Sequence, residues 1–439
     1  MSVYRIMYYK VKSIFLYSLA ALFLCCSAFT VAEDLETAPK ITSVPETRTV
    51  LEAKAEPDAK TKPEKVVETF SQWKKNFKMY ALANGVSKET LAMVLPGVEL
   101  DTEVVKLISY QPEFTKSVWE YLDKAVSKKR VQTGRRLLAK YGELLERVEK
   151  VYGVQPEYIV AIWGLESSYG KNFGDYSVVN SLASLAYASE RKKFFRDELV
   201  AALRIIQNEH FKVNELKGSW AGAMGHTQFM PSTYEKFAVS FDKDNRKDIW
   251  NSMDDVFAST ANYLKEAGWK ADQTWGIEVT LPEAFDWALA DPTTWLPISE
   301  WAKEGVIRAD GRPLNSLDEK EARVFLPAGH KGPAFLTFKN FQVIKQYNNA
   351  DAYALAVGYL GDRIRGGKEI ITEWPRKDVP LSYTQKRDLQ FLLNALGYDT
   401  NGIDGKIGPN TRAALRAWQT DMGIPADGYV NESILDLLR

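Results

Sequence analysis

The sequence predicts a mainly α fold of the α+β class, followed by a small separate unit at the C-terminal end. Five stretches place apolar residues at helical spacing, namely 66–83, 135–151, 194–209, 258–267 and 350–364. The region 275–338 is richer in proline, glycine and short β-like runs. A break follows Trp374 and Pro375, so the 439 residues divide into a domain over 65–375 and a unit over 381–439.

The first 64 residues are expected to lie outside both units. Basic residues precede an apolar run over 14–26 and small residues follow it, which is the pattern of a signal peptide over 1–32 and of export to the periplasm. Both cysteines, Cys25 and Cys26, lie in this run, and lipidation of one of them, giving an outer-membrane lipoprotein, is the alternative. Residues 33–64 have no aromatic residue and four prolines, which predicts a disordered linker.

The stretch 156–170 predicts a short buried helix that carries a carboxylate. Pro156 suits a first helical position, and Gly170 is a stop signal. One helical face is formed by Ile159, Ile162, Trp163 and Glu166. A Glu on such a face loses hydration, so its pKa should rise, as a general acid for glycosidic bond cleavage requires. A structural Glu tied to an Arg or a backbone amide is the alternative.

Composition and motifs exclude several functional classes. Lys plus Arg and Asp plus Glu each number 57, so no basic field indicates nucleic acid as a partner. The three histidines have no zinc-ligand spacing, and the sequence contains neither a glycine-rich nucleotide motif nor a G-x-S-x-G serine motif. Of the functional classes considered, catalysis by carboxylate side chains remains open.

The C-terminal unit has helical spacing over 384–396 and 411–422, with turn-rich segments after each. Two turns repeat an Asp-Gly pair, at Asp404 and Asp427, where glycine meets the positive φ of such turns. A unit of this size has a thin core, which is more typical of a binding module than of an enzyme.

Four motifs resemble the membrane-bound lytic murein transglycosylase B family, glycoside hydrolase family 103. They are AIWGLESSYG at 161–170, SWAGAMGHTQFMPSTY at 219–234, NRKDIW at 245–250 and YNNADAYALAVGYLGDRI at 347–364. The resemblance implies a lysozyme-like helical catalytic domain over 65–375. The segment 381–439 resembles the three-helix peptidoglycan-binding domain that often accompanies it.

The resemblance also implies an activity. Members of the family cleave the β-1,4 bond between N-acetylmuramic acid and N-acetylglucosamine without adding water, and they leave 1,6-anhydromuramic acid ends. Glu166 matches their single catalytic residue, which acts first as acid and then as base. The implied partners are peptidoglycan glycan strands and, as a further class, cell-wall synthases, with no nucleic acid, no required cofactor and a membrane only after lipidation.

Further site residues follow from the same motifs. The resemblance implies that the cleft is lined by Ser219, Met224, Gln228, Phe229, Tyr263, Tyr347, Asn348 and Tyr353. Gln228 can both donate and accept toward an acetamido group. The alternatives are that AGAMG packs against a neighbouring helix and that each tyrosine is a core residue with one hydrogen bond.

Some family members carry a calcium loop resembling an EF-hand at the segment 240–251. Three residues depart from that pattern: Ser240 for the first Asp, Asn245 for the turn Gly and Asn251 for the closing Glu. Asp242, Asp244 and Asp255 are therefore candidates only for a weak cation site. A metal-free loop held by Arg246 is the alternative, and calcium is not claimed.

Two other functions stay open at this stage. A lysozyme-like muramidase would hydrolyse the same bond with a second carboxylate, for which Asp175 is the nearest candidate to Glu166. A non-catalytic peptidoglycan-binding scaffold would need neither residue, although the intact Glu166 and QFMPS loop argue against it.

Overall fold

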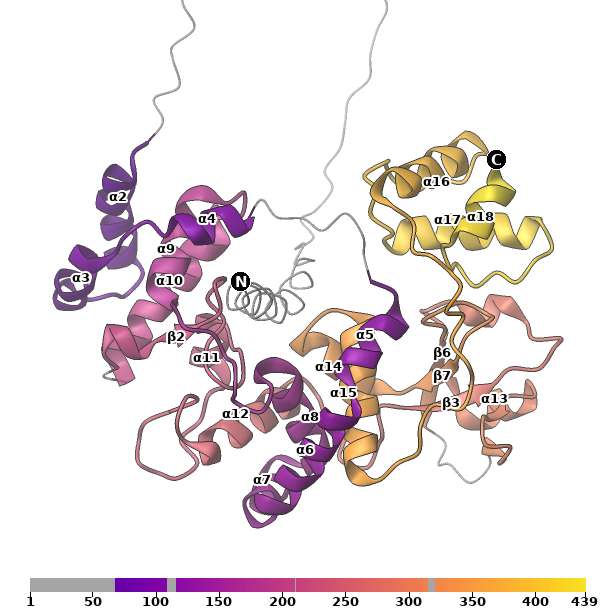
Figure 1. Cartoon of the computed structure of the whole chain (residues 1–439), viewed down its shortest axis with the longest axis horizontal. Coiled ribbons are helices and arrows are strands. Elements are labelled where there is room, and N and C mark those ends of the chain that lie inside the picture. The colour runs from indigo at the N-terminus through magenta and orange to yellow at the C-terminus, as the bar shows by residue number, and fades with distance from the viewer. Residues whose placement is uncertain (1–67, 109–115, 210, 315–319) are drawn as a thin grey trace, which may run out of the picture.

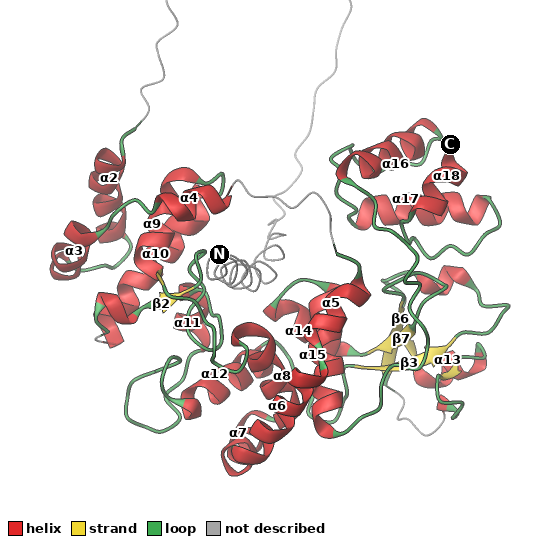
Figure 2. Ribbon diagram, in the orientation of Figure 1, coloured by secondary structure: helices red, strands yellow, loops and turns green. Residues whose placement is uncertain are grey.

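The computed structural model describes residues 68–108, 116–209, 211–314 and 320–439 (Figure 1). The predicted signal peptide over 1–32 and the predicted linker over 33–64 both lie outside the described residues. The described part is mainly helical, with one antiparallel sheet and a short strand pair (Figure 2). The predicted α+β class is confirmed, while the exact domain boundaries stay predictions.

Helices occupy most of the region before the sheet. They are α2 (Phe70–Ala83), α3 (Lys88–Val94), α4 (Thr102–Ile108), α5 (Val118–Ala125), α6 (Lys128–Lys140), α7 (Gly142–Tyr152), α8 (Pro156–Ser167), α9 (Val178–Ala188), α10 (Lys192–Glu209), α11 (Pro231–Phe237) and α12 (Met253–Glu266), with short 3₁₀ turns η1 (Leu95–Gly97) and η2 (Val213–Glu215). Strands β1 (Tyr176–Ser177) and β2 (Lys217–Gly218) pair antiparallel and tie the segment after α8 to the one after η2.

The sheet region follows, and it has a core of its own. Its strands are β3 (Gly276–Thr280), β4 (Leu296–Pro297), β5 (Ile307–Arg308), β6 (Glu321–Phe325) and β7 (Ala334–Thr337), in the order β4-β6-β7-β3-β5. The 3₁₀ turn η3 (Trp287–Ala290) and helix α13 (Ile298–Lys303) accompany them. Trp301 and Leu336 are fully buried in this second core. The β-like runs predicted from sequence are therefore confirmed as β3 and β7.

Two helices return from the sheet to the helical body. They are α14 (Lys339–Tyr347) and α15 (Asp351–Arg365). Helix α15 packs against α8, and Gly361 permits the close approach, because a Cβ there would lie 2.5 Å from the Tyr158 ring. Asp362 then accepts hydrogen bonds from the Tyr158 hydroxyl (3.1 Å) and from Nε1 of Trp275 (2.9 Å). This network joins α8, α15 and the start of the sheet.

One predicted element is wrong in its extent. The stretch 135–151 was expected to be one helix, but it is divided into α6 and α7 at Tyr141. The ring of Tyr141 packs edge-on against Trp163 and Phe257, at centroid distances of 6.0 and 5.4 Å. Turning the chain at this residue therefore brings α7 alongside α8 and α12, a long-range packing effect that helical periodicity does not contain.

The C-terminal unit consists of α16 (Tyr383–Ala395), α17 (Pro409–Asp421) and α18 (Glu432–Leu438), which confirms the three helices. Its core includes Leu389, Leu415 and Trp418. Asp427 docks it onto the sheet region, since its carboxylate accepts a hydrogen bond from the His330 backbone N–H (2.8 Å) and contacts the ring Nδ1 (2.6 Å). Among the described helices, none has the length and apolar character needed to cross a bilayer.

Candidate active site

The last turn of α8 places Glu166 beside an unusual backbone turn. Ser168, Tyr169 and Gly170 all have positive φ, at 51°, 62° and 76°. The Tyr169 ring lies so close to α8 that a Cβ on Gly164 would be 2.7 Å from it, and its hydroxyl donates to the Arg130 carbonyl (2.8 Å). The strained turn is thus held by packing on both sides, and Glu166 is fixed with it.

The Glu166 carboxyl is desolvated and has one hydrogen-bond donor. Its Oε1 accepts from the Tyr353 hydroxyl at 2.5 Å. Burial raises the pKa of Glu166 to about 7, against the hydrogen bond from Tyr353, which lowers it. The predicted rise in pKa is confirmed. The partner is a tyrosine, and within the described residues neither an Arg nor a backbone amide bonds to this carboxylate.

Two further tyrosines lie near enough to this carboxylate for its charge to act on them. Burial raises the pKa of Tyr121, on α5, and of Tyr347, at the end of α14, and the charge of Glu166 adds to both shifts. Together with Tyr353, they keep this side of the carboxyl group among neutral phenol groups rather than charged ones. Sequence reasoning missed Tyr121, because a single tyrosine on a short helix carries no signal of what it faces.

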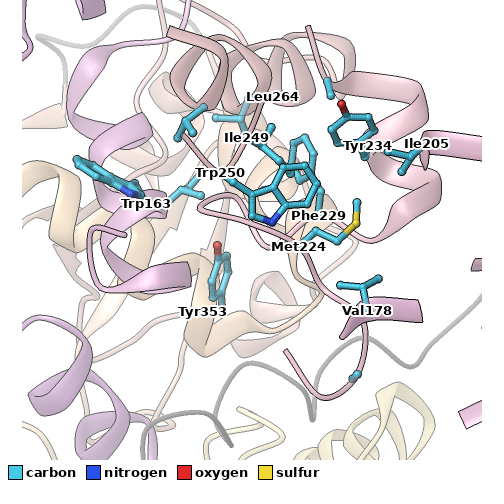
Figure 3. Close-up of a cluster of buried hydrophobic side chains, with 14 of the residues drawn as sticks. Trp163, Val178, Ile205, Met224, Phe229, Tyr234, Ile249, Trp250, Leu264 and Tyr353 are labelled. Carbon is cyan, nitrogen blue, oxygen red and sulfur yellow. The ribbon is translucent and has the colours of Figure 1, made fainter. Parts of the chain in front are cut away.

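The loop 219–230 forms a tight backbone structure beside the acid. The Met224 N–H donates to the Phe229 carbonyl (2.8 Å), and the Ser219 hydroxyl accepts from the Ala223 N–H (3.1 Å). Met224 and Phe229 are buried, with 0% and 2% of their surface exposed (Figure 3). In this structure Met224 therefore supports the loop from beneath, and its predicted contact with substrate stays a prediction.

The side-chain amide of Gln228 is oriented by hydrogen bonds to two backbone carbonyls. With φ of 52°, the residue donates through Nε2 to the carbonyls of Phe173 (3.0 Å) and Gly225 (3.0 Å). Its Oε1 accepts no hydrogen bond from any described residue. Because the donors are occupied, Gln228 is left able to accept from a ligand N–H, which narrows the expectation that it both donates and accepts.

The remaining predicted residues form an aromatic group at the ends of α12 and α14. The Tyr263 and Tyr347 rings lie 4.8 Å apart, and both contact Phe229. The Tyr347 hydroxyl donates to the Thr227 carbonyl (2.6 Å) and the Tyr263 hydroxyl to Gln346 (2.5 Å). These contacts fit the alternative of packing with one hydrogen bond, and substrate contact by these tyrosines stays a prediction.

Asn348 follows directly on this group. It is buried, and its Oδ1 has no hydrogen-bond partner among the described residues. A buried amide oxygen without a partner costs free energy unless water or a ligand meets it. The structure thus leaves an acceptor open at one of the predicted positions.

His226 braces the turn after Glu166, and sequence reasoning missed it. Its Nδ1 accepts from Nε1 of Trp163 (3.0 Å), and the two rings are stacked. Burial lowers the pKa of His226, which favours the neutral ring, and because Nδ1 accepts from Trp163, the proton of the neutral ring lies on Nε2. Gly170 allows this arrangement, since a Cβ there would lie 2.3 Å from the imidazole.

The acidic loop brings its three candidate ligands together. Carboxylate oxygens of Asp242, Asp244 and Asp255 lie within 4.8 Å of one another. Calcium takes six to eight oxygens. Asp255, however, already accepts from the backbone N–H groups of Phe241 (2.7 Å) and Asp248 (2.8 Å).

Hydrogen bonds between its own side chains, and one cation–π contact, hold this loop in place. The Ser240 hydroxyl bonds Asp242 (3.3 Å) and Asp244 (3.2 Å), and Asn251 donates to Asp248 (3.1 Å) where a closing Glu would stand. The Arg246 guanidinium stacks on Phe211, 4.0 Å from its centroid. These residues do not fit a full calcium shell.

Gly170→Ala tests whether the turn holds the site. Alanine there must adopt a left-handed conformation, which costs roughly 1–2 kcal/mol, and must also displace His226, at roughly 1–3 kcal/mol more. We expect a lower unfolding temperature together with reduced turnover. Gly268→Ala is the matched control, because φ is 95° but no atom lies within 4 Å of the added Cβ. Equal losses of unfolding temperature and turnover in the two variants would contradict a role for the close contact between Gly170 and His226.

Known proteins share this architecture. The family model described as Transglycosylase SLT domain matches residues 69–362, and a peptidoglycan binding domain model matches 384–438. Membrane-bound lytic murein transglycosylase B of Escherichia coli K12 is 31% identical over 296 residues, which cover 64% of this chain and 79% of that protein.

Solved structures agree. SltB3 from Pseudomonas aeruginosa, in complex with NAG-anhNAM-pentapeptide, is 47% identical, covers 85% of this chain and 100% of its own, and has a TM-score of 0.82. Slt35 from Escherichia coli, solved in complex with calcium, is 30% identical over 66% of this chain and 92% of its own, with a TM-score of 0.56. The expected lysozyme-like fold is confirmed. The chain belongs to the transglycosylase SLT family and is a lytic transglycosylase that carries a peptidoglycan-binding domain.

Proposed function

We propose that Glu166 alone performs the proton transfers of this reaction. The neutral carboxyl donates its proton to the glycosidic oxygen as the bond from C1 of N-acetylmuramic acid breaks, and N-acetylglucosamine leaves with a free hydroxyl. The resulting carboxylate then takes the proton of the C6 hydroxyl, whose oxygen bonds to C1 and closes the 1,6-anhydro ring. Glu166 ends protonated again, and no water is consumed.

The observation that carries this proposal is the pKa of Glu166, about 7. A carboxyl with that pKa is half protonated near neutral pH, so it can serve as acid and, after transfer, as base. Tyr353 supports both states, because its hydroxyl occupies Oε1 and leaves Oε2 for the mobile proton. The positive charge that develops at C1 is stabilised by the substrate's own acetamido group, as in substrate-assisted glycosidases.

Asp175 supports the alternative of hydrolysis poorly. It is exposed, and the pKa of Glu166 is shifted by burial and by Tyr353 rather than by a neighbouring carboxylate. Ordinary retaining or inverting hydrolysis requires two carboxyl groups that flank one bond. The mass of the product separates the two reactions, since hydrolysis adds one water and leaves a reducing end.

Glu166→Gln keeps the shape of the side chain and removes the titrating proton. We expect turnover of purified sacculi to fall by about 10²–10⁴-fold or more, while the protein still binds them. Glu157→Gln is the matched control, because Glu157 is buried on the same helix but pairs with Arg365 (3.5 Å). Mass spectrometry of the parental digest should give anhydro products. Unchanged turnover in Glu166→Gln, or reducing muramic acid ends, would contradict the proposal.

Tyr353→Phe tests the pKa through the pH profile. The hydroxyl lowers the pKa of Glu166, so removing it should raise that pKa. The acid is active when protonated, and kcat/KM therefore falls as pH rises through the pKa of the free enzyme. We expect this alkaline limb to move to higher pH, with a lower maximum rate. Tyr398→Phe, which removes a hydroxyl bonded to Asp421 in the C-terminal domain, should leave the limb in place. A shift to lower pH would refute the assignment.

We also propose that the reaction takes place in the periplasm, on the glycan strands of peptidoglycan. The signal peptide pattern over 1–32 supports this location, with lipidation at Cys25 or Cys26 as the alternative. SltB3 was solved with a peptidoglycan fragment, which supports the substrate class. Cell-wall synthases, which make the strands that are cut, are the proposed class of protein partner.

No metal ion or other cofactor is required in this proposal. Both proton transfers use Glu166, and the loop 240–251 is closed by its own side chains. We expect calcium or a chelator to leave the unfolding temperature unchanged. The double variant Ser240→Asp, Asn251→Glu restores two of the missing ligands and should gain calcium-dependent stability. A calcium-dependent rise in the unfolding temperature of the parental chain would contradict the metal-free loop.

A further inference from the structure

The C-terminal domain exposes an unusual amount of apolar surface. Twelve large apolar side chains are exposed among the described residues, and six of them lie in 381–439. The two aromatic ones, Tyr383 at 55% and Phe391 at 59% exposed, both belong to α16. Single exposed apolar side chains are ordinary, but two aromatic rings exposed on the same helix indicate a binding surface.

These aromatic residues line one ridge of the helix. Tyr383, Arg387 and Phe391 follow one another at four-residue spacing, and all three are exposed. The opposite face of α16 buries Leu389 and Leu393 in the domain core. A solvent-facing ridge is where an amphipathic helix normally carries polar residues, so burial in the domain core does not account for the large exposed surface of these two rings.

The Tyr383 ring of this ridge is held in place by the fold. Gly405 has φ of 70°, and a Cβ there would lie 2.4 Å from Cε2 of Tyr383, so the ring rests against the backbone of this turn. The Arg387 guanidinium lies 6.0 Å from the centroid of the same ring. No hydrogen bond or ion pair of Arg387 is recorded with any described residue. The guanidinium is therefore available to an anionic group beside an immobilised aromatic ring.

The ridge is also free of the rest of the chain. The domain docks onto the sheet region through Asp427 and through Arg416, which pairs with Asp291 (3.2 Å). Figure 1 shows α16 on the side of the domain away from β6 and β7. Attachment to the catalytic body thus leaves Tyr383, Arg387 and Phe391 facing outward.

We propose that the α16 ridge, defined as Tyr383, Arg387 and Phe391, binds the glycan strand of peptidoglycan. Pyranose rings have apolar faces that pack on aromatic rings, and the muramic acid side chains carry carboxylates that a guanidinium pairs with. The two aromatic positions lie about 12 Å apart along the helix, so a strand of a few sugars reaches both. This inference rests on peptidoglycan being the substrate, and it does not depend on the role of Glu166.

Other occupants fit the ridge less well. A second copy packed ridge to ridge about a two-fold axis would bring Arg387 against its own equivalent, which is unfavourable. A lipid surface would favour a cluster of exposed basic residues, but Arg387 is followed by the exposed Asp388, and Lys386 before it is only partly exposed. The charge pattern therefore favours a ligand with isolated negative groups and apolar faces.

The test uses the full chain with Glu166→Gln, so that sacculi stay intact during the measurement. In this background, Tyr383→Ser with Phe391→Ser, and separately Arg387→Gln, are compared by co-sedimentation with purified sacculi. We expect the dissociation constant to rise about tenfold for the aromatic pair and to rise less for the arginine. Leu437→Ser is the matched control, because Leu437 is 61% exposed on α18, outside the ridge, and its loss should not weaken binding.

Two results would overturn the inference. One is sacculus binding by the aromatic pair variant as tight as that of its parent, or equal weakening by Leu437→Ser. The other is a change in self-association or in binding to phospholipid vesicles while sacculus binding stays constant. Thermal unfolding at the parental temperature verifies that each variant is folded. Because turnover is not measured, a failure here leaves the assignment of Glu166 untouched.

Discussion

In the mechanism that we propose, the chemistry of this enzyme depends on one desolvated carboxyl group, which accepts a hydrogen bond from Tyr353. Apolar and aromatic surroundings penalise the charged form of Glu166, and the Tyr353 hydroxyl partly offsets that penalty. Burial without the tyrosine would leave an acid reluctant to ionise, and full solvation would leave an ordinary carboxylate. The balance of the two places the pKa between these limits, where a single group can give a proton and take one back.

Holding that balance requires the positions of distant segments to be fixed. Tyr353 is 187 residues from Glu166 in the sequence, and α8 meets α15 at the distance that Gly361 permits. The turn after Glu166 is clamped between Tyr169 and His226. Gln228 is oriented by two carbonyls of the chain. These contacts within the chain position the side chains of the site, and Oε1 of Gln228 is one of the acceptors that we propose for the sugar.

Local patterns were sufficient to predict the elements that carry the site. Proline at its first position and an apolar face predicted α8 with Glu166 on it, and the Asp-Gly pairs predicted turns with positive φ at Gly405 and Gly428. Periodicity did not predict what faces Glu166. Tyr121, His226 and the docking of Asp427 on His330 arise from contacts between segments far apart in sequence. The division of 135–151 at Tyr141 has the same cause, because the Tyr141 ring packs against Trp163, which lies on a different helix.

A direct titration of one side chain tests the account most sharply. Carbon-13 NMR of carboxyl-labelled protein, with the Glu166→Gln spectrum to assign the missing resonance, follows the ionisation of this group in the free enzyme. The account predicts a midpoint at about 7. A midpoint near the ordinary glutamate value of about 4.3, in a preparation that is fully active at neutral pH, would contradict it.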